Sequence, residues 1–179
     1  MSGTPVTALI QTARLSLEPL ADGHVAELSR LLSDPRLQKF IDPANEDDLR
    51  QALARRLGGS PDAEVSWCNW ALRLRGEDSL VGTLQATVSW RGDWPTAEVA
   101  WVVGSRWQGQ GLAREGPRAV LDWLSDQGVR TVIAHIHPDH AASQVVARAA
   151  GMMPTEELVA GEFAWRADLP QSGTQRPAL

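Results

Sequence analysis

Three amino acids are scarce or absent in this 179-residue sequence. Tyrosine does not occur, and lysine and cysteine each occur once, lysine as Lys39. Cys68 is the only cysteine, so no disulfide can form within the chain and a zinc site built from cysteines is excluded. We expect Cys68 to be an inert, half-buried thiol. The alternative, an acyl-accepting nucleophile, has no histidine that can be assigned as its partner.

Long apolar runs are also missing. None approaches the roughly 20 residues that a membrane-spanning helix needs, and the first five residues have neither the charged nor the apolar region of a secretion signal. We therefore expect a cytoplasmic protein with no membrane partner. The formal net charge is -5, which argues against a general nucleic-acid surface and favours cationic partners such as amines.

The length and composition favour one globular domain. Hydrophobic residues make up 43% of the chain and charged residues 22%, which is ordinary for a protein with a single core. We expect a loose lead-in over residues 1–11, one domain over 12–169 and a flexible tail over 170–179, which is polar and contains proline and glycine.

The most informative stretch joins a strand to a helix through two glycines. Glu98–Val103 is an apolar run of strand length, and a helical pattern covers residues 112–126. Between them, Gly109 and Gly111 allow positive φ or a close approach of the backbone to a ligand. The helix that follows begins with free N–H groups and the positive end of its dipole. This combination predicts a binding site for a phosphate or pyrophosphate.

Two other phosphate-binding motifs do not fit the same stretch. A dinucleotide fingerprint needs a third glycine where Arg114 stands. A Walker loop needs lysine after its last glycine, and the only lysine is far away in the sequence.

The remaining pattern alternates between strand and helix periods. We expect helices from Asp22 to before Asp34 and from Asn45 to Gly58, an antiparallel hairpin of strands 70–75 and 80–90, and a turn over 91–95. A strand over 131–137 follows the long helix, so it runs parallel to strand 97–104. Further strands are expected at residues 12–20, before the first helix, and at residues 158–167. A last helix is expected in residues 139–150, between strands 131–137 and 158–167. Gly116 and Pro117 predict a kink near 113–117. The fold class is α/β, with a mixed, mostly antiparallel central sheet flanked by helices.

Two motifs resemble those of the GNAT superfamily of N-acetyltransferases. Arg106-x-x-Gly109-x-Gly111 resembles the loop that binds the pyrophosphate of acyl-CoA. The stretch from Pro138 to Met152 resembles the Pro-Glu-Asn-x-Ala-Ser helix start of the RimJ/RimL-like branch, with His140 where asparagine is usual. The opening Thr-x-Arg-Leu-x-Leu-x-Pro-Leu and the two helices after it also resemble that branch, in which the two-helix region forms a wall of the acceptor site.

The resemblance implies the acyl-CoA N-acyltransferase fold, acetyl-CoA as cosubstrate, no metal, and a primary amine as acceptor. The acceptor is either a protein N-terminal amine or a small-molecule amine. A backbone N–H near Val102 or Val103, on a splayed strand, would point at the thioester oxygen, and Arg114 and Arg118 are further candidates to meet phosphates. The cofactor-binding residues implied are Trp101, Val102, Val103, Arg106, Gln108, Gly109, Gln110, Gly111, Leu112, Ala113, His140 and Ser143.

Acetyl transfer to an amine needs a base for the amine and an acid for the leaving thiolate. Glu98 matches the glutamate that many family members use as base; the alternatives are Glu115, Glu162 and, for Glu98 itself, a surface carboxylate paired with an arginine. The tyrosine that many members use as acid is replaced by Ala147. Ser143 is the implied acid, unless it bonds only its own helix backbone. A non-catalytic acyl-CoA binding or sensing module is the rival function.

Histidines and tryptophans suggest three further features. His135, His137 and His140 raise a metal hypothesis, but no cysteine or carboxylate is spaced to complete the ligand shell, so we expect none. Four tryptophans are candidates to line an acceptor cleft: Trp67, Trp70, Trp90 and Trp94. Exposed sheet edges and tryptophans are compatible with a homodimer.

Overall fold

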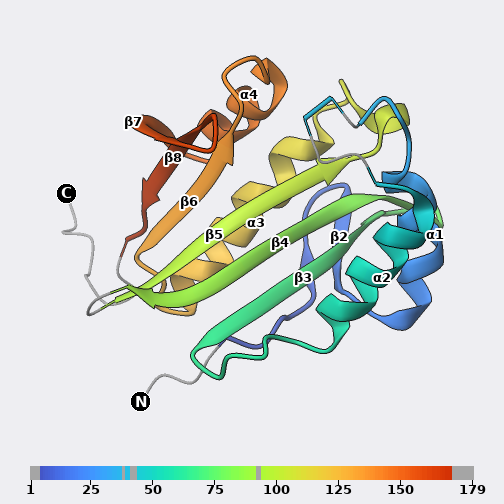
Figure 1. Ribbon diagram of the computed structural model, residues 1–179, viewed down its shortest axis with the longest axis horizontal. Coiled ribbons are helices and arrows are strands. Elements are labelled where there is room, and N and C mark those ends of the chain that lie inside the picture. Colours follow the sequence, from blue (N-terminus) through green and yellow to red (C-terminus); the bar gives the residue numbers. More distant parts are fainter. Residues whose placement is uncertain (1–4, 38, 41–43, 92–93, 171–179) are drawn as a thin grey trace.

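The computed structural model describes residues 5–37, 39–40, 44–91 and 94–170 (Figure 1). Within them, one eight-stranded sheet has the order β1-β2-β3-β4-β5-β6-β8-β7, and β5 and β6 alone are parallel neighbours. The strands are β1 (Ile10–Gln11), β2 (Leu15–Pro19), β3 (Val65–Leu74), β4 (Ser79–Arg91), β5 (Trp94–Val103), β6 (Thr131–Ile136), β7 (Met153–Val159) and β8 (Glu162–Asp168). The expected α/β class and the parallel pair are confirmed.

Helices cover both faces of the sheet. They are α1 (Asp22–Leu32), α2 (Glu46–Leu57), α3 (Leu112–Asp126) and α4 (Ala141–Ala149), with a short 3-10 turn, η1 (Ser105–Trp107), after β5. Figure 1 shows α2 in front of β3 and α3 behind the sheet. Alternation along β3 explains the two layers, because Trp70 and Leu72 join the core shared with α3 and α4, whereas Ala71 joins a smaller core with α1 and α2.

Local signals fix the helix ends. The side chain of Asn45 accepts a hydrogen bond from the backbone N–H of Asp48 at 2.9 Å, and Gly58 caps the other end of α2. Helix α3 begins after Gly111 and runs without interruption through Gly116 and Pro117. Both residues are buried, and a Cβ added to Gly116 would lie 3.4 Å from Leu84 Cδ1. That distance is an ordinary van der Waals contact, so Gly116 packs against Leu84 without needing the absence of a side chain. The expected kink stays a prediction.

The structure corrects three expectations at the ends and turns. The lead-in is not loose throughout, because β1 pairs with β2 and the carbonyls of Pro5 and Ala8 accept hydrogen bonds from Ser66 and Trp70, each at 2.8 Å. The single last strand is wrong, since β7 and β8 form a hairpin that turns at Ala160 and Gly161, both at positive φ. β4 and β5 each extend into the expected 91–95 turn.

Two further expectations concern the C-terminal tail and membrane-spanning helices. The tail expected over 170–179 lies outside the described residues except for residue 170. Among the described helices, none has both the length and the apolar character needed to cross a membrane.

Candidate functional site

Strands β5 and β6 separate part of the way along their length. Their pairing covers three residue pairs and ends with Glu98 opposite Ile133, although β5 continues to Val103 and β6 to Ile136. On its other side β5 stays paired with β4 up to Val103, opposite Gly82. A Cβ added to Gly82 would lie 2.1 Å from the Val102 carbonyl oxygen, so only glycine permits this approach of the two strands. The result is a wedge between β5 and β6.

A cavity of about 560 Å³ lies at this end of the sheet, between the end of β5, the glycine turn and the start of α4. Ten of the twelve residues implied for the cofactor line it: Trp101, Val102, Val103, Gln108, Gly109, Gly111, Leu112, Ala113, His140 and Ser143. The other two lie outside its wall. The guanidinium of Arg106 lies 5.5 Å from the Trp107 ring, and the side chain of Gln110 donates to the Arg106 carbonyl at 3.2 Å.

The glycine turn presents a row of backbone donors. Gly109 and Gly111 have φ of 75° and 76°, and Arg114 N–H is the first in α3 to bond back, to the Gly111 carbonyl. Within the described residues, the backbone N–H groups of 109–113 donate no recorded hydrogen bond. Five neighbouring donors at a helix start can bind the oxygens of a pyrophosphate.

An ion pair behind the turn holds it in place. Arg14 pairs with Glu115 of α3, and its Nη1 donates to the Gln110 carbonyl at 2.8 Å. Glu115 also accepts a hydrogen bond from the Thr12 hydroxyl at 2.7 Å. Burial acts to raise the pKa of Glu115, but the hydrogen bonds from Thr12 and Arg14 outweigh it, so the pKa is lowered. Glu115 is thus an anchor between the β1–β2 turn and α3, which disfavours it as the base.

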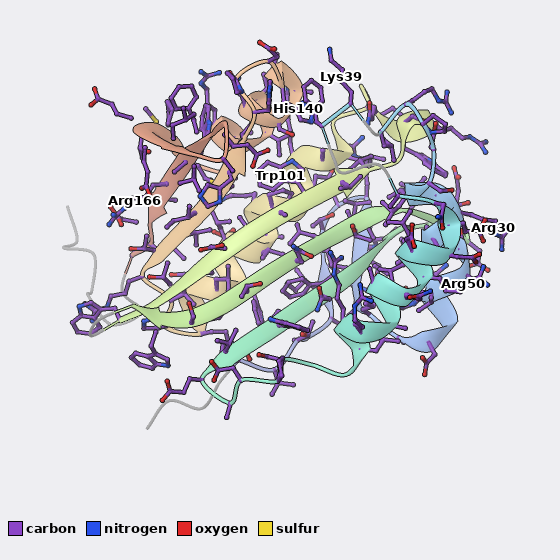
Figure 2. All side chains as sticks on the ribbon, viewed as in Figure 1. Arg30, Lys39, Arg50, Trp101, His140 and Arg166 are labelled. Carbon is purple, nitrogen blue, oxygen red and sulfur yellow. The ribbon has the colours of Figure 1, made fainter. Side chains whose placement is uncertain are left out.

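The segment between α1 and α2 supplies a wall that the motifs did not identify residue by residue. Arg36, Leu37, Lys39 and Phe40 line the cavity, and the Phe40 ring stacks on His140 with centroids 4.0 Å apart. Figure 2 shows Lys39 and His140 at the same end of the molecule. The resemblance implied such a wall for the acceptor, but this connection has no periodic pattern that would place individual side chains. Arg114, a candidate to meet phosphates, also lines the cavity. The other lining residues lie within the two motif stretches but were not singled out from the sequence: Trp107, Asp139, Ala141, Ala142, Val145 and Val146.

Two groups near the cavity, Asp34 and His140, have shifted pKa values in the folded protein. Hydrogen bonds from Arg36 and from the hydroxyl of Ser105 hold the pKa of Asp34 far below its usual range, and these bonds tie the end of α1 to η1. Burial lowers the pKa of His140, and the nearby His137 and Lys39 act in the same direction. The lowered pKa favours the neutral form of His140, which stacks on an aromatic ring without a desolvated charge.

The two residues assigned to catalysis lie on different sides of the wedge. Ser143 is half-buried in the cavity wall, and within the described residues its hydroxyl makes no recorded hydrogen bond. Glu98 is half-buried outside the cavity wall, opposite Thr87 of β4. Glu98, Ala100 and Val102 share one face of β5, and Val102 lines the cavity. Residues two positions apart on a strand are about 7 Å apart, so Ala100 lies between Glu98 and Val102.

Several sequence candidates lie away from the cavity. Trp70 is 1% exposed and packs edge-on against Trp123 in the core, so its expected place in a cleft is wrong. Trp67, Trp90 and Trp94 are exposed but line no part of the cavity. Arg118 pairs with Asp122 at 3.5 Å. Cys68 is 1% exposed rather than half-buried, and burial raises the pKa of its thiol.

The histidines do not gather around a common point. The Nδ1 atom of His137 accepts from the Asp139 N–H at 3.1 Å, and His140 stacks on Phe40. Among the described residues, no group of three or more histidine, cysteine or acidic side chains is arranged to hold a metal ion.

Comparisons with known proteins agree with this geometry. A family model of the acetyltransferase (GNAT) domain matches residues 14–153. The fold is similar to a GNAT-family acetyltransferase from Bacillus anthracis, with 21% identity and a TM-score of 0.73 over 90% of this chain and 98% of that one. It is also similar to an acetyl transferase from Salmonella typhimurium that modifies the N-terminal serine of ribosomal L7/L12, with 16% identity and a TM-score of 0.70 over 91% and 100%. A third similar structure is RimL, a ribosomal L7/L12 alpha-N-protein acetyltransferase in complex with coenzyme A, with 17% identity and a TM-score of 0.69 over 90% and 98%.

Proposed function

Because the chain belongs to the acetyltransferase (GNAT) family, we propose that it transfers an acetyl group directly from acetyl-CoA to a primary amine. The observation that carries the proposal is the cavity, which joins the end of β5 that has separated from β6 to the donor row of the glycine turn. A pyrophosphate on that row and a pantetheine arm in the wedge would use backbone groups that the sheet and α3 leave without partners. Acetyl-CoA supplies the activated acyl group when it is bound.

The chain's own residues then manage two protons. The attacking nitrogen forms its bond to the acetyl carbon, the carbon–sulfur bond breaks, and the amine gives up one proton. We assign that proton to Glu98, directly or through water, because Glu98 lies on the open face of β5 next to the wedge. The leaving sulfur takes one proton, which we assign to the Ser143 hydroxyl. The N–H of Val102 or Val103 is our candidate for polarising the thioester carbonyl.

The acceptor that we favour is the N-terminal amine of a protein. Two similar structures are described as acting on the N-terminus of ribosomal L7/L12, one of them on a serine. In Figure 1 no described helix lies in front of β5, so the face of β5 that carries Glu98, opposite the core residues Ala97 and Val99, offers a peptide an approach. A small-molecule amine is the second candidate acceptor.

A non-catalytic acyl-CoA binding module remains a rival because the chain has no tyrosine and carries Ala147 in the position of the usual acid. Both functions predict cofactor binding, whereas the enzyme alone predicts turnover.

Thermal unfolding with and without acetyl-CoA tests the shared prediction. At about 100 times the dissociation constant, binding adds roughly 2.7 kcal/mol to the unfolding free energy and raises Tm by several degrees. NAD and ATP are the controls, and an equal shift with either would contradict the assignment. A thiol-release assay with hexapeptides that begin with serine or alanine then separates enzyme from module: acetyl-CoA binding without acetylation of peptides or amines would favour the module.

A further inference from the structure

The open face of the sheet carries a row of polar side chains next to Glu98. Strand register places Asn69 of β3 beside Gln85 of β4, and Gln85 beside Ala100 of β5. Two residues beyond the Glu98–Ile133 pair, His135 of β6 stands on the same face, across the wedge. We call Asn69, Gln85 and His135 the polar row; the small side chain of Ala100 lies between Gln85 and His135. The row lies between Glu98 and the cavity-lining Val102.

The polar row lies opposite the main core. Cys68 and Trp70 flank Asn69 and belong to the core shared with α3, as do Leu84 and Ala86, which flank Gln85. Because side chains alternate along a strand, Asn69 and Gln85 point to the other face. Figure 1 shows α2 crossing this face over β3. Helix α1 packs on the start of β4, where Leu28 and Leu80 share the smaller core, whereas β5 has no described helix in front of it in Figure 1. Ala100 is exposed, so the floor of the row is open.

The side-chain amides in this row are available to a partner from outside the chain. Within the described residues, the amides of Asn69 and Gln85 take part in no recorded hydrogen bond, and the same holds for the His135 ring. Asn69 is only 9% exposed, and Gln85 and His135 are half-buried. No fully buried side-chain nitrogen or oxygen of the described residues lacks a hydrogen-bond partner, so these amide groups reach solvent rather than being sealed in a core. A bound molecule can therefore take the place of solvent at them.

The chemistry of the row specifies that partner. Asn and Gln each offer two N–H donors and one carbonyl acceptor, and a neutral histidine offers one of each. None carries the negative charge that would select a polycation. A peptide group has one donor and one acceptor, which matches an amide side chain. We propose that Asn69 and Gln85 hydrogen-bond the first peptide group of the acceptor, and so select a peptide N-terminus over an amine that lacks an amide. This rests on the proposed function.

The test compares two forms of one acceptor. The probes are a hexapeptide that begins with alanine and its analogue in which the first peptide N–H is replaced by an ester oxygen. We expect the wild-type kcat/KM to be about threefold to tenfold higher for the amide, the value of one net hydrogen bond. In Gln85→Leu, which keeps the side-chain size, the amide-to-ester ratio falls towards one while kcat/KM for the ester stays the same.

Controls keep the outcomes separate. Ser89 lies on the same strand and face, four residues from Gln85 and further from the cavity, so Ser89→Ala leaves the ratio at its wild-type value. Asn69→Ala, which lowers the amide-to-ester ratio in the same way as Gln85→Leu, is the second variant. Asn69→Asp, a replacement of equal size, takes its place if Asn69→Ala does not fold by circular dichroism. The same ratio in wild type and in Gln85→Leu overturns the inference. Acetylation of a simple alkyl amine but of no peptide overturns it as well, whereas no binding of acetyl-CoA overturns the proposed function itself.

Discussion

Two side chains on opposite sides of the wedge are assigned to the two proton transfers. Glu98→Gln removes the base and Ser143→Ala removes the acid, so we expect each to lower kcat by about 10²–10⁴-fold, the usual contribution of a positioned acid or base. The acetyl-CoA-induced rise in Tm stays, because neither side chain holds the pyrophosphate. Steady-state thiol release measures the first effect and thermal unfolding the second.

Glu162 provides a matched control for Glu98. It is a glutamate that begins a strand, but it lies at the β7–β8 turn and outside the cavity wall. Glu162→Gln leaves kcat at the wild-type level. Wild-type turnover in both Glu98→Gln and Ser143→Ala would refute the assigned roles.

Sequence spacing located the turn residues of the site but missed the wall opposite them. Gly109, Gly111 and the start of α3 are contiguous, so a motif of a few residues determines their geometry. Phe40 and His140 are a hundred positions apart, and their stacking depends on how the α1–α2 connection folds back over α4. Short-range patterns carry no information about such a contact. The prediction that Trp70 lines a cleft was wrong for a related reason. The exposure of a side chain on β3 depends on which face of the strand the helices cover, and local sequence does not show this.

Strands β4 and β5 can approach each other at the wedge only because Gly82 has no side chain. In Gly82→Ala the added methyl would meet the Val102 carbonyl at 2.1 Å, which forces a backbone shift. We expect a loss of unfolding free energy of about 1–3 kcal/mol, the typical cost of overpacking, together with weaker acetyl-CoA binding. Urea unfolding and ligand-induced shifts in Tm measure the two effects.

A second glycine on another element serves as the control. Gly23 lies in the first turn of α1, and an added Cβ there meets nothing within 4 Å. Gly23→Ala therefore has no effect or stabilises the protein by up to ~1 kcal/mol through helix propensity. Equal stabilities for Gly82→Ala and wild type would show that the strand contact is not tight.

Elements with strong local signals were predicted well, and those that depend on pairing were not. The cap at Asn45 and the glycine after α2 fixed that helix from sequence. β1 is two residues long and exists only because β2 is beside it. The β7–β8 hairpin was missed because its turn, Ala160–Gly161, has alanine at positive φ, where asparagine, aspartate or glycine gives the usual signal.

In the part of the chain that the structure describes, four carboxylates have lowered pKa values in the folded state. Side-chain hydrogen bonds from Arg73, Arg36 and Arg166 are the main cause for Glu18, Asp34 and Asp168, respectively. Glu115 is lowered by Thr12 and Arg14 against its burial. A carboxylate with a lowered folded pKa stabilises the fold above its unfolded value and loses that contribution as the pH falls through the folded pKa. The unfolded values are 4.5 for Glu and 3.8 for Asp.

We therefore expect the unfolding free energy to decrease steadily below about pH 4.5. His140 adds an earlier loss below pH 6.5, because its lowered folded pKa means that the unfolded chain takes up a proton first. Urea unfolding between pH 7 and pH 3 measures both. Glu115→Gln, which cannot titrate, shows a smaller decrease below pH 4.5 than wild type, and a constant unfolding free energy down to pH 3 in the wild type would contradict this account.

The homodimer suggested by the sequence stays a prediction. β7 forms one edge of the sheet, and the exposed apolar side chains there and on β8 are Met153, Leu158, Val159 and Phe163.

The short pairing between β5 and β6 also has a mechanical consequence. Three residue pairs are the only parallel ladder joining strands β1–β5 to strands β6, β8 and β7 in the described sheet. The sheet thus consists of two parts, the N-terminal plate (β1–β5) and the C-terminal plate (β6, β8 and β7), and we call the short ladder that joins them the seam. Helices α3 and α4 bridge the two plates on the core face alone. Opening of the seam would release the C-terminal plate as one cooperative unit in hydrogen exchange. A molecule filling the wedge would hold both plates, so it would slow exchange of amides far from any atom that it touches.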